Sequence, residues 1–222
     1  MRRLSIESRL ILQHYDDQPL DFLVADYAAF YPFQYDSTER ADLSPYVMPI
    51  FAPDQPLLST WLRPFWPPGQ VVETYVLLDR INRAIARDFT HQRREEPGVQ
   101  TPAATLAKRA GSCRDFATLF IEACHCLGLA ARFVSGYFYS PTLTPGQGAT
   151  HAWSEVYLPG AGWKGFDSTT GDVVGNDHIA VAVGRHPEAV PPVAGSFLAA
   201  NHQWPVMRVV VEVAEISRNS AG

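Results

Sequence analysis

The spacing of apolar residues changes at Gly128, and this change constrains the fold more than any other feature of the sequence. Before it, residues 113–127 place apolar side chains at intervals of three and four, which predicts a helix with one buried face. Leu127-Gly128 is a typical helix stop. After it the period becomes two, which predicts strands near 130–139, 150–158, 162–168, 178–185 and 205–216. Helices followed by a set of antiparallel strands indicate an α+β fold.

Three further patterns refine the predicted strands. The sequence Pro159-Gly160-Ala161-Gly162 lies between two of them and predicts a hairpin. Residues 4–12 alternate apolar and polar side chains and predict an opening strand. Residues 206–213, which are rich in valine, have the strongest strand composition in the chain.

The amino-terminal third is less regular than the rest. Residues 13–69 combine many prolines with many aromatic residues, which is typical of short helices and turns packed over a core. Two helices are then predicted over 71–89 and 102–108. A length of 222 residues suits one core with an appended segment. We therefore expect an irregular amino-terminal segment over 1–69, with one strand and short helices, and a core domain over 70–222.

Composition limits the classes of partner. The chain has 18 Lys and Arg against 23 Asp and Glu, a net charge of -5 with no long run of either sign, so neither nucleic acid nor a membrane is expected as a partner. We find no signal-peptide pattern and no apolar run long enough to span a bilayer, and we expect a cytoplasmic protein. Three cysteines do not form a disulfide framework, so reduced thiols are expected.

Cys113 is the candidate nucleophile. It follows Gly111-Ser112 and lies in the first turn of the predicted helix, where free N–H groups and the helix dipole lower a thiol pKa that is ordinarily about 8.5. Cys124 and Cys126 lie among apolar residues of the same helix and are expected in the core. The run Cys124-His125-Cys126 resembles a metal-ligand cluster, but consecutive helical side chains point about 100° apart and cannot converge on one ion.

A catalytic thiol needs a base and a group that orients the base. His151 opens a predicted strand directly after a glycine-rich loop, and a hairpin turn near 160–161 brings Asp167 within a residue or two of it. An aspartate there would accept the imidazole N–H and stabilise the imidazolium. Cys113, His151 and Asp167 are therefore the candidate catalytic residues.

Several alternatives remain open at this point. His178 and His186 flank another strand, and either could be the base in a different register. Together with Asp177 they could instead form a metallohydrolase site. Smaller assignments also follow: Asp115 is expected to cap the helix and Arg114 to be solvated, whereas Trp153 and Tyr137 could either line a groove or pack.

The sequence resembles the transglutaminase-like superfamily, in particular its bacterial transglutaminase-like cysteine peptidases. The matching segments are 101–104, 111–117, 131–137, 151–156, 162–169 and 177–185. The resemblance implies a papain-like α+β fold in which the nucleophile helix packs on an antiparallel sheet, with Cys113, His151 and Asp167 at the positions of the triad. It also differs from the family: the amino-terminal β-rich region is shorter, Arg114 replaces a common glutamine, and His91 replaces a common aromatic residue.

This arrangement predicts acyl transfer at amide or peptide carbonyls through a thioester on Cys113, with its backbone N–H as one oxyanion donor. Water as acceptor would make the protein a cysteine peptidase or amidase, and lysine would make it a cross-linking transamidase. The resemblance favours hydrolysis of a peptide, protein or amide substrate, without a cofactor or a metal. The alternative from another class is a non-catalytic binding or scaffold module.

Overall fold

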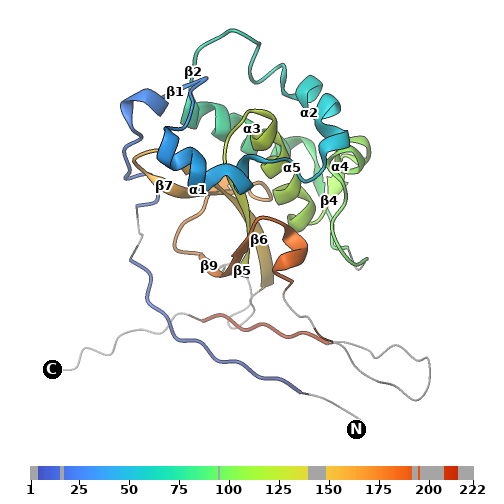
Figure 1. Ribbon diagram of the computed structural model, residues 1–222. Coiled ribbons are helices and arrows are strands. Elements are labelled where there is room, and N and C mark those ends of the chain that lie inside the picture. The colour runs from blue at the N-terminus through green and yellow to red at the C-terminus, as the bar shows by residue number, and fades with distance from the viewer. Residues whose placement is uncertain are drawn as a thin grey trace, which may run out of the picture.

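The computed structural model describes residues 5–15, 18–94, 96–139, 149–191, 195 and 208–214. A five-stranded antiparallel sheet forms one layer, and the helices gather on one side of it, as Figure 1 shows. The predicted α+β class, with a helix that begins at the candidate nucleophile and packs on an antiparallel sheet, is confirmed.

The helices match their sequence patterns closely. The described part of the chain has five α-helices: α1 (Ser37–Val47), α2 (Gln55–Leu62), α3 (Thr74–Asp88), α4 (Pro102–Lys108) and α5 (Cys113–Cys126). Short 3₁₀ turns are η1 (Asp26–Ala28), η2 (Ala52–Asp54) and η3 (Pro187–Ala189). The prediction over 102–108 is confirmed residue for residue, and α5 ends where Gly128, at a φ of 72°, reverses the chain in a conformation that favours glycine.

The main sheet has the strand order β8-β7-β6-β5-β9. Its strands are β5 (Ala131–Phe138), β6 (Ala149–Leu158), β7 (Gly162–Asp167), β8 (Asp172–Val173) and β9 (His178–Gly184). Four of the predicted strands and the hairpin between β6 and β7 are thereby confirmed. Two small pairs complete the described strands: β1 (Phe30–Tyr31) with β2 (Val72–Glu73), and β3 (Thr90–His91) with β4 (Ala110–Gly111).

Two predicted strands are wrong where the structure describes them. Residues 5–12 and 208–214 belong to no strand, and residues 4, 205–207 and 215–216 lie outside the described part of the chain. Most of the apolar side chains concerned are exposed, such as Ile6 and Val210. Alternation indicates which side chains could share a face, but a strand also needs a hydrogen-bonded neighbour, and no pattern within one segment supplies that neighbour.

Helix α5 forms the centre of the hydrophobic core. Its residues Phe116, Leu119 and Phe120 are fully buried, with β5 and β6 on one side and α2, α3 and α4 packed around the rest. Burial of each such side chain contributes about 1.5–3 kcal/mol. A hydrogen bond also ties helix to sheet, because the Ser154 hydroxyl of β6 donates to the carbonyl of Ala117 at 3.0 Å. The core therefore fixes where the amino end of α5 meets the sheet.

A buried carboxylate fastens the amino-terminal segment to α5. Glu122 is fully buried and accepts hydrogen bonds from the backbone N–H groups of Ile50 and Phe51, both at 3.0 Å, and from Gln55 at 3.3 Å. Its other contact is with the His125 ring at 2.8 Å. Burial raises the pKa of Glu122, but the histidine and the two N–H donors outweigh it and hold the pKa below its ordinary value.

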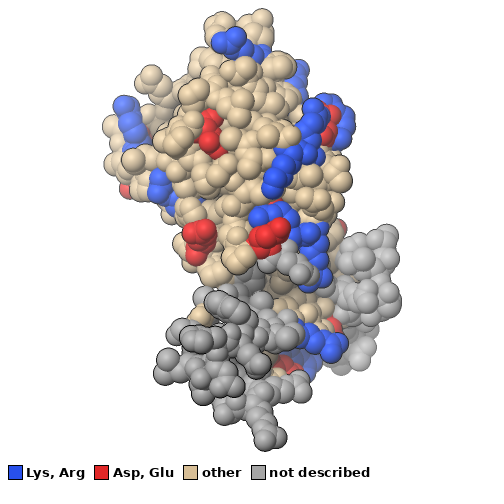
Figure 2. Space-filling view, turned by 90° about the vertical axis from the view of Figure 1, so that its right-hand side faces the viewer, with Lys and Arg blue, Asp and Glu red and all other residues tan. Residues whose placement is uncertain are grey.

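Charged side chains of both signs are mixed on the surface. On the face that Figure 2 shows, acidic and basic side chains lie next to one another at several points among wide areas of other residues. No helix in the described ranges is both long and apolar enough to cross a bilayer.

We expect Glu122→Gln to lower the free energy of unfolding by about 3 kcal/mol at pH 7, because the neutral amide leaves buried donors without their charged acceptor. The wild-type contribution is present above the ordinary carboxyl pKa of about 4.3 and is lost as the pH falls through the lower pKa of the folded state. Urea unfolding of both proteins between pH 3 and 7 measures this. Asp79→Asn, which removes the partly exposed Asp79–Arg83 ion pair, is the control and should change stability by less than about 1 kcal/mol.

Candidate active site

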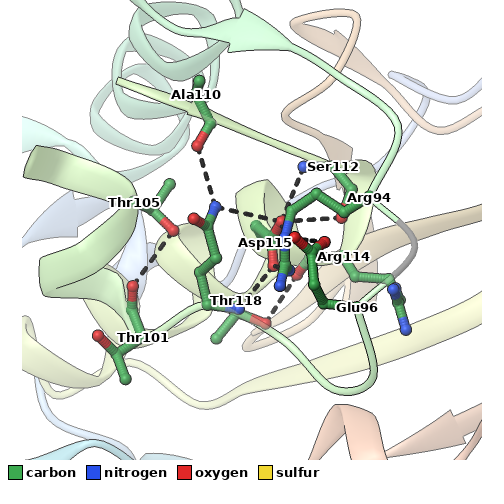
Figure 3. Close-up of polar contacts among 10 residues, drawn as sticks. Arg94, Glu96, Thr101, Thr105, Ala110, Ser112, Arg114, Asp115 and Thr118 are labelled. Carbon is green, nitrogen blue, oxygen red and sulfur yellow. Dashed lines mark hydrogen bonds and ion pairs between the residues drawn. The ribbon is translucent and has the colours of Figure 1, made fainter. Parts of the chain in front are cut away.

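The start of α5 is held by a second buried carboxylate. Asp115 and Ser112 form a capping box, in which the Ser112 backbone N–H and hydroxyl donate to Asp115 at 2.8 and 2.9 Å. The predicted capping role of Asp115 is confirmed. Arg94 donates to the same carboxylate at 2.8 Å, as Figure 3 shows. The Gln100 backbone N–H also donates to it, at 2.7 Å. These contacts fix the turn that presents Cys113.

Asp115 stays ionised in this setting. Burial raises the pKa of Asp115, but hydrogen bonds from Gln100, Ser112 and Arg94 outweigh that effect and keep the pKa below its ordinary value. Arg94 is itself mostly buried, and its second acidic neighbour, Glu96 at 3.5 Å, is exposed. The Arg94 guanidinium therefore interacts mainly with the buried Asp115 carboxylate.

A two-stranded parallel pair brings His91 to the nucleophile. In this pair, β3 aligns His91 with Gly111 of β4, two residues before Cys113. The His91 ring lies 6.1 Å from that of Phe116, and the imidazole interacts with the Cys113 thiol and lowers its pKa. Nothing in the sequence indicated this contact, because a two-residue parallel pair has no periodicity of its own.

The structure brings Cys113, His151 and Asp167 together. The Cys113 thiol interacts electrostatically with the His151 ring, and the Nε2 atom of His151 lies 2.7 Å from Oδ2 of Asp167. Because Nε2 faces the carboxylate, Nδ1 is the ring nitrogen that can face the sulfur. The hairpin explains the juxtaposition: Ser154 pairs with Phe166, so Asp167 lies one residue farther along, next to the His151 end of β6.

Electrostatics favour an ion pair between sulfur and imidazole. Burial raises the pKa of the Cys113 thiol, but His151 and His91 outweigh it and bring the pKa to about 6. Burial lowers the pKa of His151, whereas Asp167 and Cys113 raise it to about 10. Between these two values the pair is mainly thiolate and imidazolium, the charge state of a thiol nucleophile beside its proton donor.

Asp167 is the anchor of this set. It is fully buried, and its Oδ1 accepts the Thr169 backbone N–H at 2.8 Å. Burial raises the pKa of Asp167, but the hydrogen bonds of His151, His178 and Thr169 lower it far more, well below its usual range. The carboxylate therefore stays charged wherever the protein is folded at neutral pH.

His178 and His186, the alternative bases, lie in different places. The Nε2 atom of His178 lies 3.1 Å from Oδ2 of Asp167, and His186 caps η3 by accepting the Glu188 N–H at 3.1 Å. A metal site on Asp177, His178 and His186 is therefore not assembled. Within the described ranges, the group with metal-ligand spacing is His151, Asp167 and His178.

The remaining cysteines and aromatic residues have structural roles. Cys124 is fully buried in the core, as expected, and the partly buried Cys126 donates to Gln55 Oε1 at 2.8 Å. Trp153, for which packing and substrate contact were both open, is buried and packs against His178. All three cysteines are free thiols, which agrees with the expectation of reduced cysteines.

Comparison with known proteins gives a consistent result. The family model described as the transglutaminase-like superfamily matches residues 72–168. An uncharacterized protein of Mycobacterium tuberculosis is 33% identical over 178 residues, or 76% of this chain and 51% of that protein. A crystal structure of a candidate cysteine protease from Cytophaga hutchinsonii aligns with a TM-score of 0.56 and 26% identity, covering 70% of this chain and 50% of the other. The chain thus spans about half the length of these relatives.

The thiol pKa values predict selective alkylation. At pH 7, iodoacetamide should modify Cys113 rapidly and leave the other two cysteines intact, because burial raises the pKa of Cys126 to about 11 and that of Cys124 still further. Peptide mapping after a timed reaction identifies the modified residue, and rates from pH 4 to 9 give a midpoint near 6.

His91→Phe tests the cause of that midpoint. The variant keeps an aromatic ring beside Phe116 but removes one imidazole from the sulfur, so the midpoint should move to higher pH. Equal alkylation of all three cysteines at pH 7 in the wild type would contradict the geometry described above.

Asp115→Asn should lower the free energy of unfolding by about 3 kcal/mol, since the amide cannot pair with Arg94 or accept all the donors around it. Denaturant unfolding at pH 7 measures the change. Glu96→Gln is a matched control, because Glu96 also faces Arg94 but is exposed, and it should change stability by less than about 1 kcal/mol. A similar small loss for both variants would show that the buried network contributes little.

Proposed function

Because residues 72–168 of this chain belong to the transglutaminase-like superfamily, we propose that the protein is a thiol-dependent acyl-transfer enzyme that hydrolyses amide or peptide bonds. The observation that carries the proposal is the 2.7 Å contact between His151 and Asp167, with the same His151 ring lowering the pKa of the Cys113 thiol. A solvent-exposed histidine or a cysteine packed in the core does not ordinarily combine a buried carboxylate partner with a strongly shifted pKa.

The proposed reaction begins with the ion pair. The Cys113 thiolate attacks the substrate carbonyl carbon, and the His151 imidazolium gives its proton to the leaving amine, which leaves a thioester on the sulfur. Neutral His151 then takes a proton from water as the water attacks the thioester. Collapse of that intermediate releases the acid and restores the thiolate and the imidazolium, so every proton is returned.

Asp167 and the start of α5 contribute at fixed positions. Asp167 accepts the Nε2 proton of His151, which holds the ring with its other nitrogen toward the sulfur and stabilises the imidazolium. The Cys113 backbone N–H lies in the first turn of α5, where N–H groups lack an intrahelical acceptor, and we assign it to the oxyanion. One such donor contributes about a hundredfold to a thousandfold in rate.

Hydrolysis is favoured over the other outcomes for two reasons. The candidate cysteine protease from Cytophaga hutchinsonii shares the fold and 26% of aligned residues. In addition, Cys113 is partly exposed, so water can reach the thioester. Transamidation would need an amine bound at the same place, and a scaffold role would leave the lowered pKa of Cys113 without a use.

An activated acyl donor tests the nucleophile directly. With p-nitrophenyl acetate, intact-protein mass spectrometry should show one acetyl group on the wild type that disappears over time, and none on Cys113→Ala. Cys113→Ala should fold normally, because it removes one partly exposed sulfur. Cys126→Ala is the matched control and should acetylate like the wild type.

The acceptor is then identified in the same experiment. Addition of a primary amine should leave the yield of free acetate unchanged if water is the acceptor, and should convert it to an acetamide if the enzyme transfers to amines. Acetylation of Cys113→Ala at the wild-type rate would overturn the proposed nucleophile, and a wild type that never acetylates would favour the scaffold alternative.

A further inference from the structure

We propose that His178 is a positioning residue that holds the carboxylate of Asp167 in the orientation His151 requires. The inference rests on the proposed function, because it assigns a role within the same site. His178 is the first residue of β9, beyond the residues 72–168 that the family model matches, and the proposed steps do not include it.

The contacts of Asp167 carry the argument. Nε2 of His178 lies 3.1 Å from Oδ2 of Asp167, the same oxygen that His151 contacts at 2.7 Å. The other oxygen, Oδ1, accepts the Thr169 N–H at 2.8 Å. Without His178, the contact of Oδ2 with a side chain in the described residues would be that with His151. The position of the Asp167 carboxylate would then depend on the same histidine that the carboxylate has to orient.

The tautomer of His178 is fixed by its second contact. The backbone N–H of Gly175 donates to Nδ1 of His178 at 3.4 Å, which requires a lone pair on Nδ1. The ring proton therefore lies on Nε2, where it is donated to Asp167. The same contact argues against a metal on His151, Asp167 and His178, because Nε2 of His178 then has no lone pair to offer an ion.

Packing keeps the ring in place and away from substrate. His178 is only 6% exposed, and its ring lies edge-on to Phe138 at 4.9 Å and to Trp153 at 5.2 Å between centroids. Aromatic walls exclude water from the hydrogen bond to Asp167 and strengthen it. The polar contact of the His178 Nε2 atom is with Asp167, so His178 acts on the site through that carboxylate.

The backbone of β5 makes this approach possible. Gly136 pairs with His151 on one side and with Ala180 on the other, and the β5–β9 register shifts between Ser135 and Gly136. A Cβ atom at Gly136 would lie 2.1 Å from the carbonyl oxygen of Ile179, so only glycine lets β9 come this close. Residue 179 follows His178 directly. The close approach of β9 to β5 therefore brings the His178 imidazole to the Asp167 carboxylate.

The proposed benefit arises because His151 changes charge during each acyl transfer. A carboxylate tied only to His151 could rotate whenever the ring became neutral, and the ring would lose its alignment with the sulfur. With Thr169 on one oxygen and His178 on the other, the carboxylate keeps its plane throughout. Loss of His178 should therefore slow the chemical step and leave substrate binding nearly unchanged.

Two substitutions separate hydrogen bonding from packing. His178→Phe keeps a flat ring between Phe138 and Trp153 but removes the donor, and His178→Gln loses the ring but keeps an N–H near the position of Nε2. With p-nitrophenyl acetate, kcat should fall about 10- to 100-fold in His178→Phe and much less in His178→Gln, with KM within about twofold in both. The reverse order would show that His178 only fills space and would overturn the proposal.

A second measurement needs no turnover and separates this inference from the proposed function. The pH midpoint for alkylation of Cys113 by iodoacetamide should rise in His178→Phe, because a misaligned Asp167 stabilises the His151 imidazolium less. Below the midpoint, each unit of rise slows the reaction about tenfold, and the rates should converge at pH 9. An unchanged midpoint in a folded His178→Phe protein rejects the role of His178. A wild type that alkylates normally but never turns over rejects only the proposed function.

Discussion

A charged carboxylate can be buried only where donors surround it, and this constraint shapes the molecule at three places. Glu122, Asp115 and Asp167 are all fully buried, and each accepts hydrogen bonds from segments far apart in the sequence. Glu122 fastens the segment before α2 to α5, Asp115 fixes the start of α5, and Asp167 joins β7 to β6 and β9. Asp115 holds the turn before the nucleophile and Asp167 holds the base, so a buried carboxylate positions each of the two groups.

The buried carboxylates Asp115 and Asp167 have different electrostatic roles. Asp115 uses Arg94 and backbone N–H groups to hold the turn before Cys113, and its charge is largely neutralised there. Asp167 faces backbone N–H groups and two imidazoles, so its charge acts on His151 and, together with Cys113, raises the pKa of that ring to about 10. Similar residues thus serve different ends because one is paired with a guanidinium and the other is not.

Sequence reasoning succeeded where one segment or one turn determines the outcome. The helix start at Cys113 and the hairpin that carries Asp167 to His151 follow from local patterns, and the structure places both as predicted. The contacts of His91 and His178 depend on which strands pair, and on a register shift beside Gly136, neither of which a single segment encodes. The two incorrect strand predictions near the ends of the chain have the same cause. Alternation indicates which side chains share a face, but it does not indicate which strand pairs with the segment.

The register shift at Gly136 joins backbone geometry to the chemistry of the site. A regular β5–β9 ladder would keep β9 at the usual spacing, whereas the irregular one lets the Ile179 carbonyl approach a position where no side chain exists. Irregular pairing removes hydrogen bonds between the two strands. In return, the His178 imidazole can donate to the same Asp167 oxygen that His151 contacts. Such sharing weakens each bond to Oδ2 a little but fixes the direction of the carboxylate. Direction is the property that a group orienting a base must have.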